Sequence, residues 1–167
     1  MRSTRKIVMA ALLCSLCCVA TMVIKIPIPG GYGYANLGDC VVIVAGFMLS
    51  PLYGFIAAGL GSALADVFSG YVVYIPVTFL IKGTMALICH FGFKLFNKKQ
   101  IKKTVSRVIC ALAAEILMVA GYYLFEGFLY GFIPSLSSVP LNALQGLLGI
   151  VLGVILTKIF DDNKIVF

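Results

Sequence analysis

The sequence predicts an all-α integral membrane protein, with one bundle of six transmembrane helices over residues 1–167. Three observations predict this fold. Hydrophobic residues make up 62% of the chain and charged residues only 11%, whereas charged residues make up about 25% of a soluble domain. Long apolar runs alternate with short polar breaks, and about 20 apolar residues suffice to cross a bilayer. The basic residues gather in a few of these breaks. We therefore expect a multi-pass protein of the cell membrane.

Each predicted helix ends at charged or turn-forming residues. The apolar run that starts at Ile7 is too long for a signal peptide and no cleavage site follows it, so we expect a retained first helix. The segment KIPIPGGYGYAN cannot be helical because of its prolines and glycines. Later breaks are Ser50-Pro51, Ser69-Gly70, NKKQIKKTVSR and GFIPSLSSVP. The predicted helices are Ile7–Ile26, Leu37–Leu49, Leu52–Phe68, Tyr74–Phe96, Val105–Leu129 and Leu141–Phe160, the second short enough to be tilted or partly buried.

The basic residues orient the predicted bundle. Eleven of the 13 lie at the N-terminus, after the fourth helix and at the C-terminus, regions that six spans place on one side. Basic segments stay in the cytoplasm, so both termini are predicted to be cytoplasmic. The eleven are Arg2, Arg5, Lys6, Lys94, Lys98, Lys99, Lys102, Lys103, Arg107, Lys158 and Lys164. Short basic clusters between apolar runs indicate contact with membrane lipid and no nucleic-acid partner.

Several kinds of chemistry have no motif in the chain. The six cysteines lie in apolar runs and are expected to be packing residues, so neither a metal site nor a cofactor is predicted. No phosphate-binding loop is present, so the chain cannot use ATP alone. Neither GxSxG nor HExxH occurs, and we expect no enzymatic activity.

Polar residues gather in the half of the membrane opposite the basic clusters. They are Asp39, Asp66, Lys82, Glu126, Asn142 and Gln145, and seven of the eight tyrosines lie there too. A charge inside the membrane costs at least about 2.5–3.5 kcal/mol and usually has a partner or a function. Two interpretations stay open: Lys82 pairs with Asp66 to hold two helices together, or both border a ligand pocket open to the outside.

Small residues predict a packing face on the first helix. Ala10, Cys14 and Cys18 recur at intervals of four, with Ala11, Ser15 and Val19 beside them. Such stripes let helix backbones approach closely in lipid. This surface could pack within the chain or against another membrane protein.

Several segments together resemble the S components of energy-coupling factor (ECF) vitamin transporters. They are LGD at Leu37–Asp39, SPLYG at Ser50–Gly54, GSALAD at Gly61–Asp66, PVTFLIKG at Pro76–Gly83, GYYLFEGFLYG at Gly121–Gly131 and VPLNALQGLLG at Val139–Gly149. The nearest group is the riboflavin-type one, which includes subunits for pyridoxine and hydroxymethylpyrimidine.

The resemblance implies a substrate-binding subunit with no enzymatic activity. It implies a vitamin site near the outer face under a lid at Pro27–Asn36, and a first-helix stripe, Ala10, Cys14 and Cys18, that meets a scaffold subunit. The partner would be an ECF module with that transmembrane scaffold and two ATPases. The expected substrate-binding residues are Tyr34, Asn36, Asp39, Asp66, Tyr74, Lys82, Glu126, Asn142 and Gln145.

Flat tyrosine walls and a few polar groups favour a planar heterocycle. A B6 vitamer or a similar small ring is the favoured substrate, with riboflavin next. Two alternatives stay open. A self-sufficient dimeric transporter would need a carboxylate at membrane depth, for which Glu115 is the candidate. A small membrane enzyme would need its reactive groups together at one depth, whereas Glu115 and His90 are isolated in the sequence.

Overall fold

The computed structural model describes residues 2–28 and 34–163, and within this part the chain is almost entirely helical. The elements in chain order are α1 (Arg2–Val23), β1 (Lys25–Pro27), β2 (Tyr34–Asn36), α2 (Gly38–Met48), α3 (Pro51–Ser69), the single-turn helix η1 (Val72–Tyr74), α4 (Ile75–Lys98), α5 (Lys103–Tyr130), α6 (Phe132–Ser135) and α7 (Val139–Asp162). Residues 29–33, in the middle of the predicted lid, lie outside the described residues.

In the described part of the chain, five helical segments are long and apolar enough to cross a membrane: Thr4–Val23, Pro51–Ser69, Val72–Lys98, Lys103–Tyr130 and Phe132–Asp162. The sixth predicted helix corresponds to α2, which has 11 residues. At 1.5 Å per residue α2 spans about 16 Å, roughly half of a bilayer core. The nine residues Gly38–Gly46 are all buried, and α2 packs against α1, α3, α4 and α7. The second helix is thus a buried helix in the core of the bundle, whereas its shortness indicated only a tilted or partly buried one.

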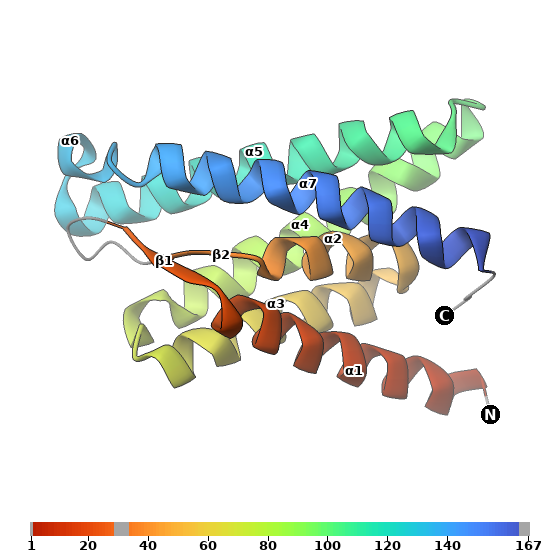
Figure 1. The fold of residues 1–167 in the computed structure, drawn as a ribbon, viewed down its shortest axis with the longest axis horizontal. Helices are drawn as coiled ribbons and strands as arrows, with labels where there is room; N and C mark the ends of the chain where they lie inside the picture. Colours follow the sequence, from red (N-terminus) through yellow and green to blue (C-terminus); the bar gives the residue numbers. More distant parts are fainter. Residues whose placement is uncertain (1, 29–33, 164–167) are drawn as a thin grey trace.

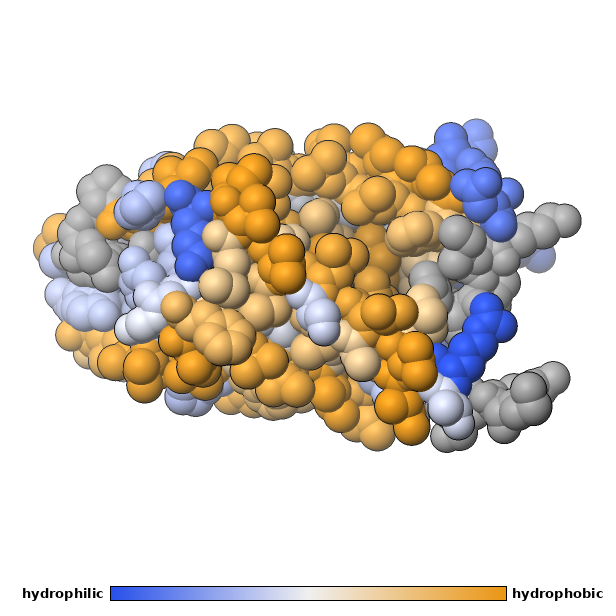
Figure 2. Space-filling view, turned by 60° about the horizontal axis from the view of Figure 1, so that its bottom comes forward, coloured by the Kyte–Doolittle hydropathy of each residue, from blue (hydrophilic) through white to orange (hydrophobic). Residues whose placement is uncertain are grey.

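The ends of the bundle differ in polarity. The start of α1, the turn between α4 and α5 and the end of α7 all lie at one end of the molecule (Figure 1). The described members of the three predicted basic clusters lie at this end, and a broad apolar surface separates it from the other end (Figure 2). The β1–β2 ribbon, η1 and α6 lie at the opposite end, where the sequence placed the polar cluster.

A two-stranded antiparallel ribbon is the main departure from an all-α fold. Lys25 pairs with Asn36, Ile26 with Ala35 and Pro27 with Tyr34. Helix α1 therefore ends at Val23 and not at the predicted Ile26. The cause is local: residues before prolines disfavour helical backbone, and Ile26 precedes Pro27.

The predicted loop before the last helix also contains structure. Gly131 has φ +95°, a conformation that favours glycine, and it ends α5. One further turn, α6, follows, and the hydroxyl of Ser135 donates to the carbonyl oxygen of Gly131 at 2.8 Å. This turn returns the chain to α7 at the polar end of the bundle.

The small residues of α1 and α3 pack against each other. A β-carbon on Gly61 would lie 2.4 Å from the carbonyl oxygen of Cys14, so only glycine permits this approach. Ala10 and Cys18 are each 8% exposed and face the interior of the chain. Ala11 and Ser15, one position along, are exposed. The stripe predicted to meet a partner is thus largely covered by the chain itself.

Candidate ligand-binding site

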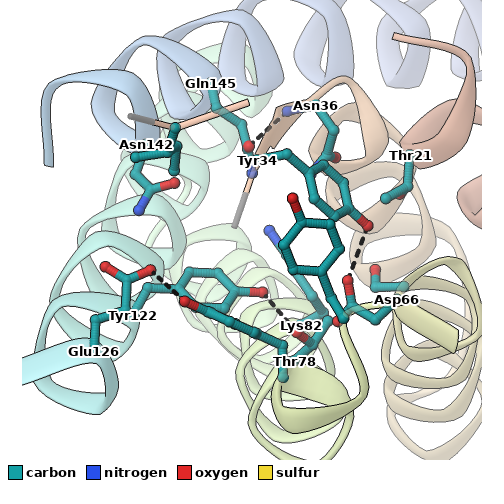
Figure 3. Close-up of a pocket in the computed structure, with 14 residues that line it drawn as sticks. Thr21, Tyr34, Asn36, Asp66, Thr78, Lys82, Tyr122, Glu126, Asn142 and Gln145 are labelled. Atoms are coloured by element: carbon teal, nitrogen blue, oxygen red, sulfur yellow. Dashed lines mark hydrogen bonds between the residues drawn. The ribbon is translucent and has the colours of Figure 1, made fainter. Parts of the chain in front are cut away.

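A polar pocket lies between the helices at the end of the bundle opposite the basic clusters (Figure 3). The residues that line the pocket come from α1, the ribbon, α3, the η1–α4 segment, α5 and α7. The lining residues are Thr21, Ile28, Tyr34, Asn36, Ser62, Asp66, Tyr71, Tyr74, Thr78, Lys82, Tyr122, Glu126, Asn142 and Gln145. The lining includes polar side chains from four of the five helices on which the sequence placed them, whereas α2 contributes no lining residue and α1 contributes Thr21.

Lys82 forms an ion pair at the base of the pocket. Its ammonium group donates to Asp39 Oδ1, and both side chains are almost fully buried. The ammonium nitrogen also lies 5.5 Å from the centre of the Tyr122 ring, within range of a cation–π interaction. The interpretation that Lys82 pairs with Asp66 is wrong, because α2 supplies the partner. A lysine has three N–H donors, so Lys82 can hold Asp39 and still donate into the pocket.

A chain of hydrogen bonds extends from this pair to the ribbon. Gln145 Nε2 donates to Asp39 Oδ2 at 2.6 Å, and the backbone N–H of Asn36 donates to Gln145 Oε1 at 2.8 Å. The Asn36 side chain accepts from the N–H of Gly38 at 2.8 Å. These contacts join α2, α4, α7 and β2, so the position of the ribbon is coupled to the charged base of the pocket.

Asp66 on α3 makes a separate contact with the ribbon. Its Oδ1 accepts a hydrogen bond from the Tyr34 hydroxyl at 2.8 Å (Figure 3). Burial and the nearby Asp66 carboxylate raise the pKa of Tyr34, which keeps its hydroxyl protonated as a donor. The second oxygen of Asp66 is buried and accepts no hydrogen bond from the described residues. Asp66 can therefore accept from a ligand, because an unsatisfied buried acceptor is costly.

Glu126 and Asn142 form the other side of the pocket. Glu126 accepts hydrogen bonds from Ser138 and, at 3.4 Å, from the Tyr74 hydroxyl. Asn142, only 4% exposed, reaches toward the pocket from α7 (Figure 3). This side offers both donors and acceptors at the edge of a bound molecule.

Four tyrosines form an almost continuous aromatic wall. The ring centres of Tyr34 and Tyr71 are 5.0 Å apart, those of Tyr71 and Tyr74 6.0 Å, and those of Tyr74 and Tyr122 6.4 Å. The Tyr122 hydroxyl donates to Thr78 Oγ1 at 3.1 Å, which fixes that ring. Such a wall presents flat, weakly polar surfaces suited to a planar ring.

Eight of the nine predicted substrate-binding residues line this pocket. Asp39 does not: it is fully buried behind Lys82 and Gln145, where it positions both side chains. Sequence reasoning did not select Thr21, Ser62, Tyr71, Thr78 and Tyr122. The excess of tyrosines at this end was a signal for Tyr71 and Tyr122. No feature of the sequence pointed to Thr21, Ser62 and Thr78, because serine and threonine are ordinary packing residues in membrane helices.

Comparison with known proteins identifies the family. The model of the ECF-type riboflavin transporter S component matches residues 1–161. The chain belongs to the ECF S component family. An S component is a membrane-embedded subunit of a vitamin uptake system that works with an ECF module, and the family is one of transporters and not of enzymes.

Two individual relatives are similar to most of the chain. A Pyrococcus woesei protein described as uncharacterized is 35% identical over 136 residues, covering 81% of this S component and 87% of the relative. The thiamine precursor transporter HmpT of Lactococcus lactis is 23% identical, covering 98% and 92% of the two chains.

Two solved structures share the fold. One, described as the S component of a bacterial ECF transporter, has a TM-score of 0.77 at 23% identity, with 97% of this S component and 98% of that chain covered. The other is the S component for biotin from an ECF-type ABC transporter, with a TM-score of 0.65 at 20% identity and coverage of 94% and 93%. At these identities the likeness concerns the fold.

Proposed function

We propose that this S component captures a small planar vitamin or vitamin precursor from outside the cell. The observation that carries this proposal is the pocket itself: an aromatic wall of four tyrosines faces a few fixed polar groups, with Lys82 at the base. The substrate we favour is a B6 vitamer or a similar pyridine or pyrimidine, with riboflavin next. The name of the Lactococcus lactis relative, a thiamine precursor transporter, supports a small ring, whereas the description of the family model names riboflavin.

Binding of such a ring would divide between stacking and polar contacts. Tyr74 and its neighbours would cover the faces of the ring, while Lys82 would donate to an oxygen or ring nitrogen. Asn142 would donate and accept at the edge, and the second oxygen of Asp66 would accept from a hydroxyl or N–H group. A neutral or electron-rich heterocycle with several edge groups satisfies all of these.

The ribbon would cover the bound molecule. The predicted lid begins at the last residue of β1 and ends with β2, which is tied to the bundle by Tyr34–Asp66 and Asn36–Gln145. Closing this ribbon over the pocket would exclude water and strengthen the polar contacts beneath it. Lid function of residues 27–36 is part of the proposal.

Energy would come from partners. We infer that the partner is an ECF module with a transmembrane scaffold and two cytoplasmic ATPases, as the sequence resemblance to ECF S components implies. The chain has no phosphate-binding loop of its own and so needs a partner that uses ATP. The surface on α1 available for the scaffold is the exposed line of Ala11 and Ser15, because Ala10 and Cys18 are buried within the chain. A self-sufficient dimeric transporter or a membrane enzyme is not favoured, since the family is one of S components.

Substrate identity can be tested on the purified protein. Native mass spectrometry of the detergent-solubilised chain should show a retained small molecule whose mass identifies the substrate class. Isothermal titration with pyridoxine, hydroxymethylpyrimidine and riboflavin should then rank the candidates, with a small ring binding more tightly than riboflavin. Tighter binding of riboflavin would reject our preferred substrate but keep the vitamin pocket. No retained molecule and no measurable binding of any vitamin would contradict the proposed function.

A further inference from the structure

Glu115 on α5 is a buried carboxyl group that the pocket does not use. Its side chain is only 3% exposed, and neither oxygen accepts a hydrogen bond from the described residues. The residue lies near the middle of a helix of 28 residues that is apolar enough to cross the membrane. An ionised carboxylate without donors is very unfavourable in such surroundings, whereas the neutral acid is much less so.

Another carboxyl group, that of Asp39, lies beside Glu115. A β-carbon placed on Gly149 would lie 2.7 Å from Glu115 Oε1 and 2.9 Å from the β-carbon of Asp39. Because Gly149 has no side chain, α7 leaves a space that the side chains of Glu115 and Asp39 share. Gly146 leaves similar room, since its β-carbon would lie 3.1 Å from Glu115 Oε2.

The charges around this site do not balance if both carboxyl groups are ionised. Glu115 interacts electrostatically with Asp39 from α2 and with Lys82 and Cys89 from α4. Tyr122, which is also on α5, faces Lys82. Helix α7 contributes Gly146 and Gly149 at this point, and neither carries a charge. Lys82 is the single cation of this group, and its ion pair is with Asp39. Two carboxylates in contact around one cation leave an uncompensated buried negative charge.

The hydrogen bonds decide which carboxyl group keeps its charge. Asp39 accepts from Lys82 at one oxygen and from Gln145 at the other, so both of its oxygens already have donors. Glu115 has no such donors. A protonated Glu115 could itself donate to Asp39, which would give the protonated oxygen of Glu115 a hydrogen-bond partner. The described residues contain no group of three or more His, Cys, Asp or Glu side chains able to hold a metal ion.

We propose that Glu115 is a proton-binding site beneath the pocket, protonated at neutral pH and donating to Asp39. Lys82, Asp39 and Glu115 then form a cluster with no net charge. Loss of the proton would add a second negative charge beside Lys82 and hold its ammonium group toward α2, away from the pocket. The link from proton binding to substrate affinity rests on the proposed function, whereas the proton site itself does not.

Infrared spectroscopy of the whole protein in lipid vesicles near neutral pH tests the site without any vitamin. A protonated carboxylic acid has a carbonyl stretching band that a carboxylate lacks and that shifts in D₂O. We expect such a band in the native protein and its loss in Glu115→Gln. The matched control is Glu126→Gln, which removes a buried glutamate that, unlike Glu115, accepts hydrogen bonds from Ser138 and Tyr74. The control should keep the band, as should Asp66→Asn.

A second variant separates a shared proton from a merely buried acid. In Asp39→Asn, Glu115 becomes the carboxyl group available to Lys82, so it should ionise and the band should disappear although Glu115 is still present. A band that persists in Glu115→Gln, or a native protein without one, would overturn the proposal. Persistence in Asp39→Asn would overturn the sharing with Asp39. Failure to bind any vitamin would affect the proposed function and leave these infrared results unchanged.

Discussion

At the scale of single residues, Lys82 has two roles that a simple deletion cannot separate. It neutralises Asp39, and it lines the pocket. Removing one partner of a buried ion pair leaves the other charge uncompensated, which is strongly destabilising. Loss of binding in Lys82→Ala alone could therefore reflect loss of folding.

A double substitution resolves this ambiguity. Lys82→Met with Asp39→Asn removes both charges together and keeps similar side-chain volumes, so the bundle should stay folded. Binding of the vitamin that titrates most tightly to the native protein should still weaken at least about tenfold, since losing one buried polar contact costs about 1–3 kcal/mol and about 1.4 kcal/mol is a factor of ten. Isothermal titration on folded protein measures the change.

Thr84→Ala is the control for this experiment, because Thr84 is on the same helix and its hydroxyl donates to the carbonyl oxygen of Leu80 at 2.7 Å, away from the pocket. Asn142→Ala should weaken binding by a similar factor to the double variant. Unchanged affinity in a folded double variant would assign Lys82 a purely structural role and displace the proposed site.

At the scale of elements, α1 has one side that packs inside the chain and one that faces outward. Leu13 and Cys17 are buried, whereas Leu12 and Leu16 are each more than half exposed. Between the exposed leucines, Ala11 and Ser15 form a shallow line. Close approach of another helix is possible along such a line because the side chains are small.

Bulky residues on that line should block the partner without disturbing the bundle. Ala11→Leu with Ser15→Leu should abolish co-purification of the S component with its ECF module and abolish vitamin uptake. Vitamin binding by the isolated chain should not change. Ala113→Leu, on the exposed side of α5, is the matched control and should leave assembly intact. Normal uptake by the double variant would exclude this face of α1 as the partner surface.

At the scale of the whole molecule, polarity defines two ends. The basic clusters and both ends of the described chain share one end, and the pocket opens at the other. By the positive-inside rule we propose that the basic end is cytoplasmic. With the short α2 counted among six membrane-embedded helices, this orientation would direct the pocket outward, as the proposed capture of an external vitamin requires.

Cysteine labelling of intact cells tests this orientation. The six native cysteines are buried or half-buried and are replaced first. A cysteine at Gln100, in the α4–α5 turn, should react with a membrane-impermeant thiol reagent only after the cells are opened. A cysteine at Ser137, exposed at the pocket end, should react in intact cells. The reverse pattern would show that the pocket faces the cytoplasm.

Sequence alone determined the membrane class, the approximate bounds of the long helices and the common depth of the polar residues. These properties depend on composition and local order: apolar runs of sufficient length, proline and glycine breaks, and clustered lysines. The depth of a residue in the membrane follows from the number of residues between it and the end of its helix. This count places Lys82, Glu126 and Asn142 at a similar depth.

Tertiary structure decided which side chains meet. The sequence could not choose Asp39 over Asp66 as the partner of Lys82, because that choice depends on how α2 rotates against α4. It also could not show that Ala10 and Cys18 face inward, since a stripe of small residues can pack on either side of a helix. Glu115 looked isolated along the chain and adjoins Asp39 only because Gly146 and Gly149 bring α7 close. Contacts of this kind depend on the relative rotation and separation of helices distant in sequence, which local patterns do not encode.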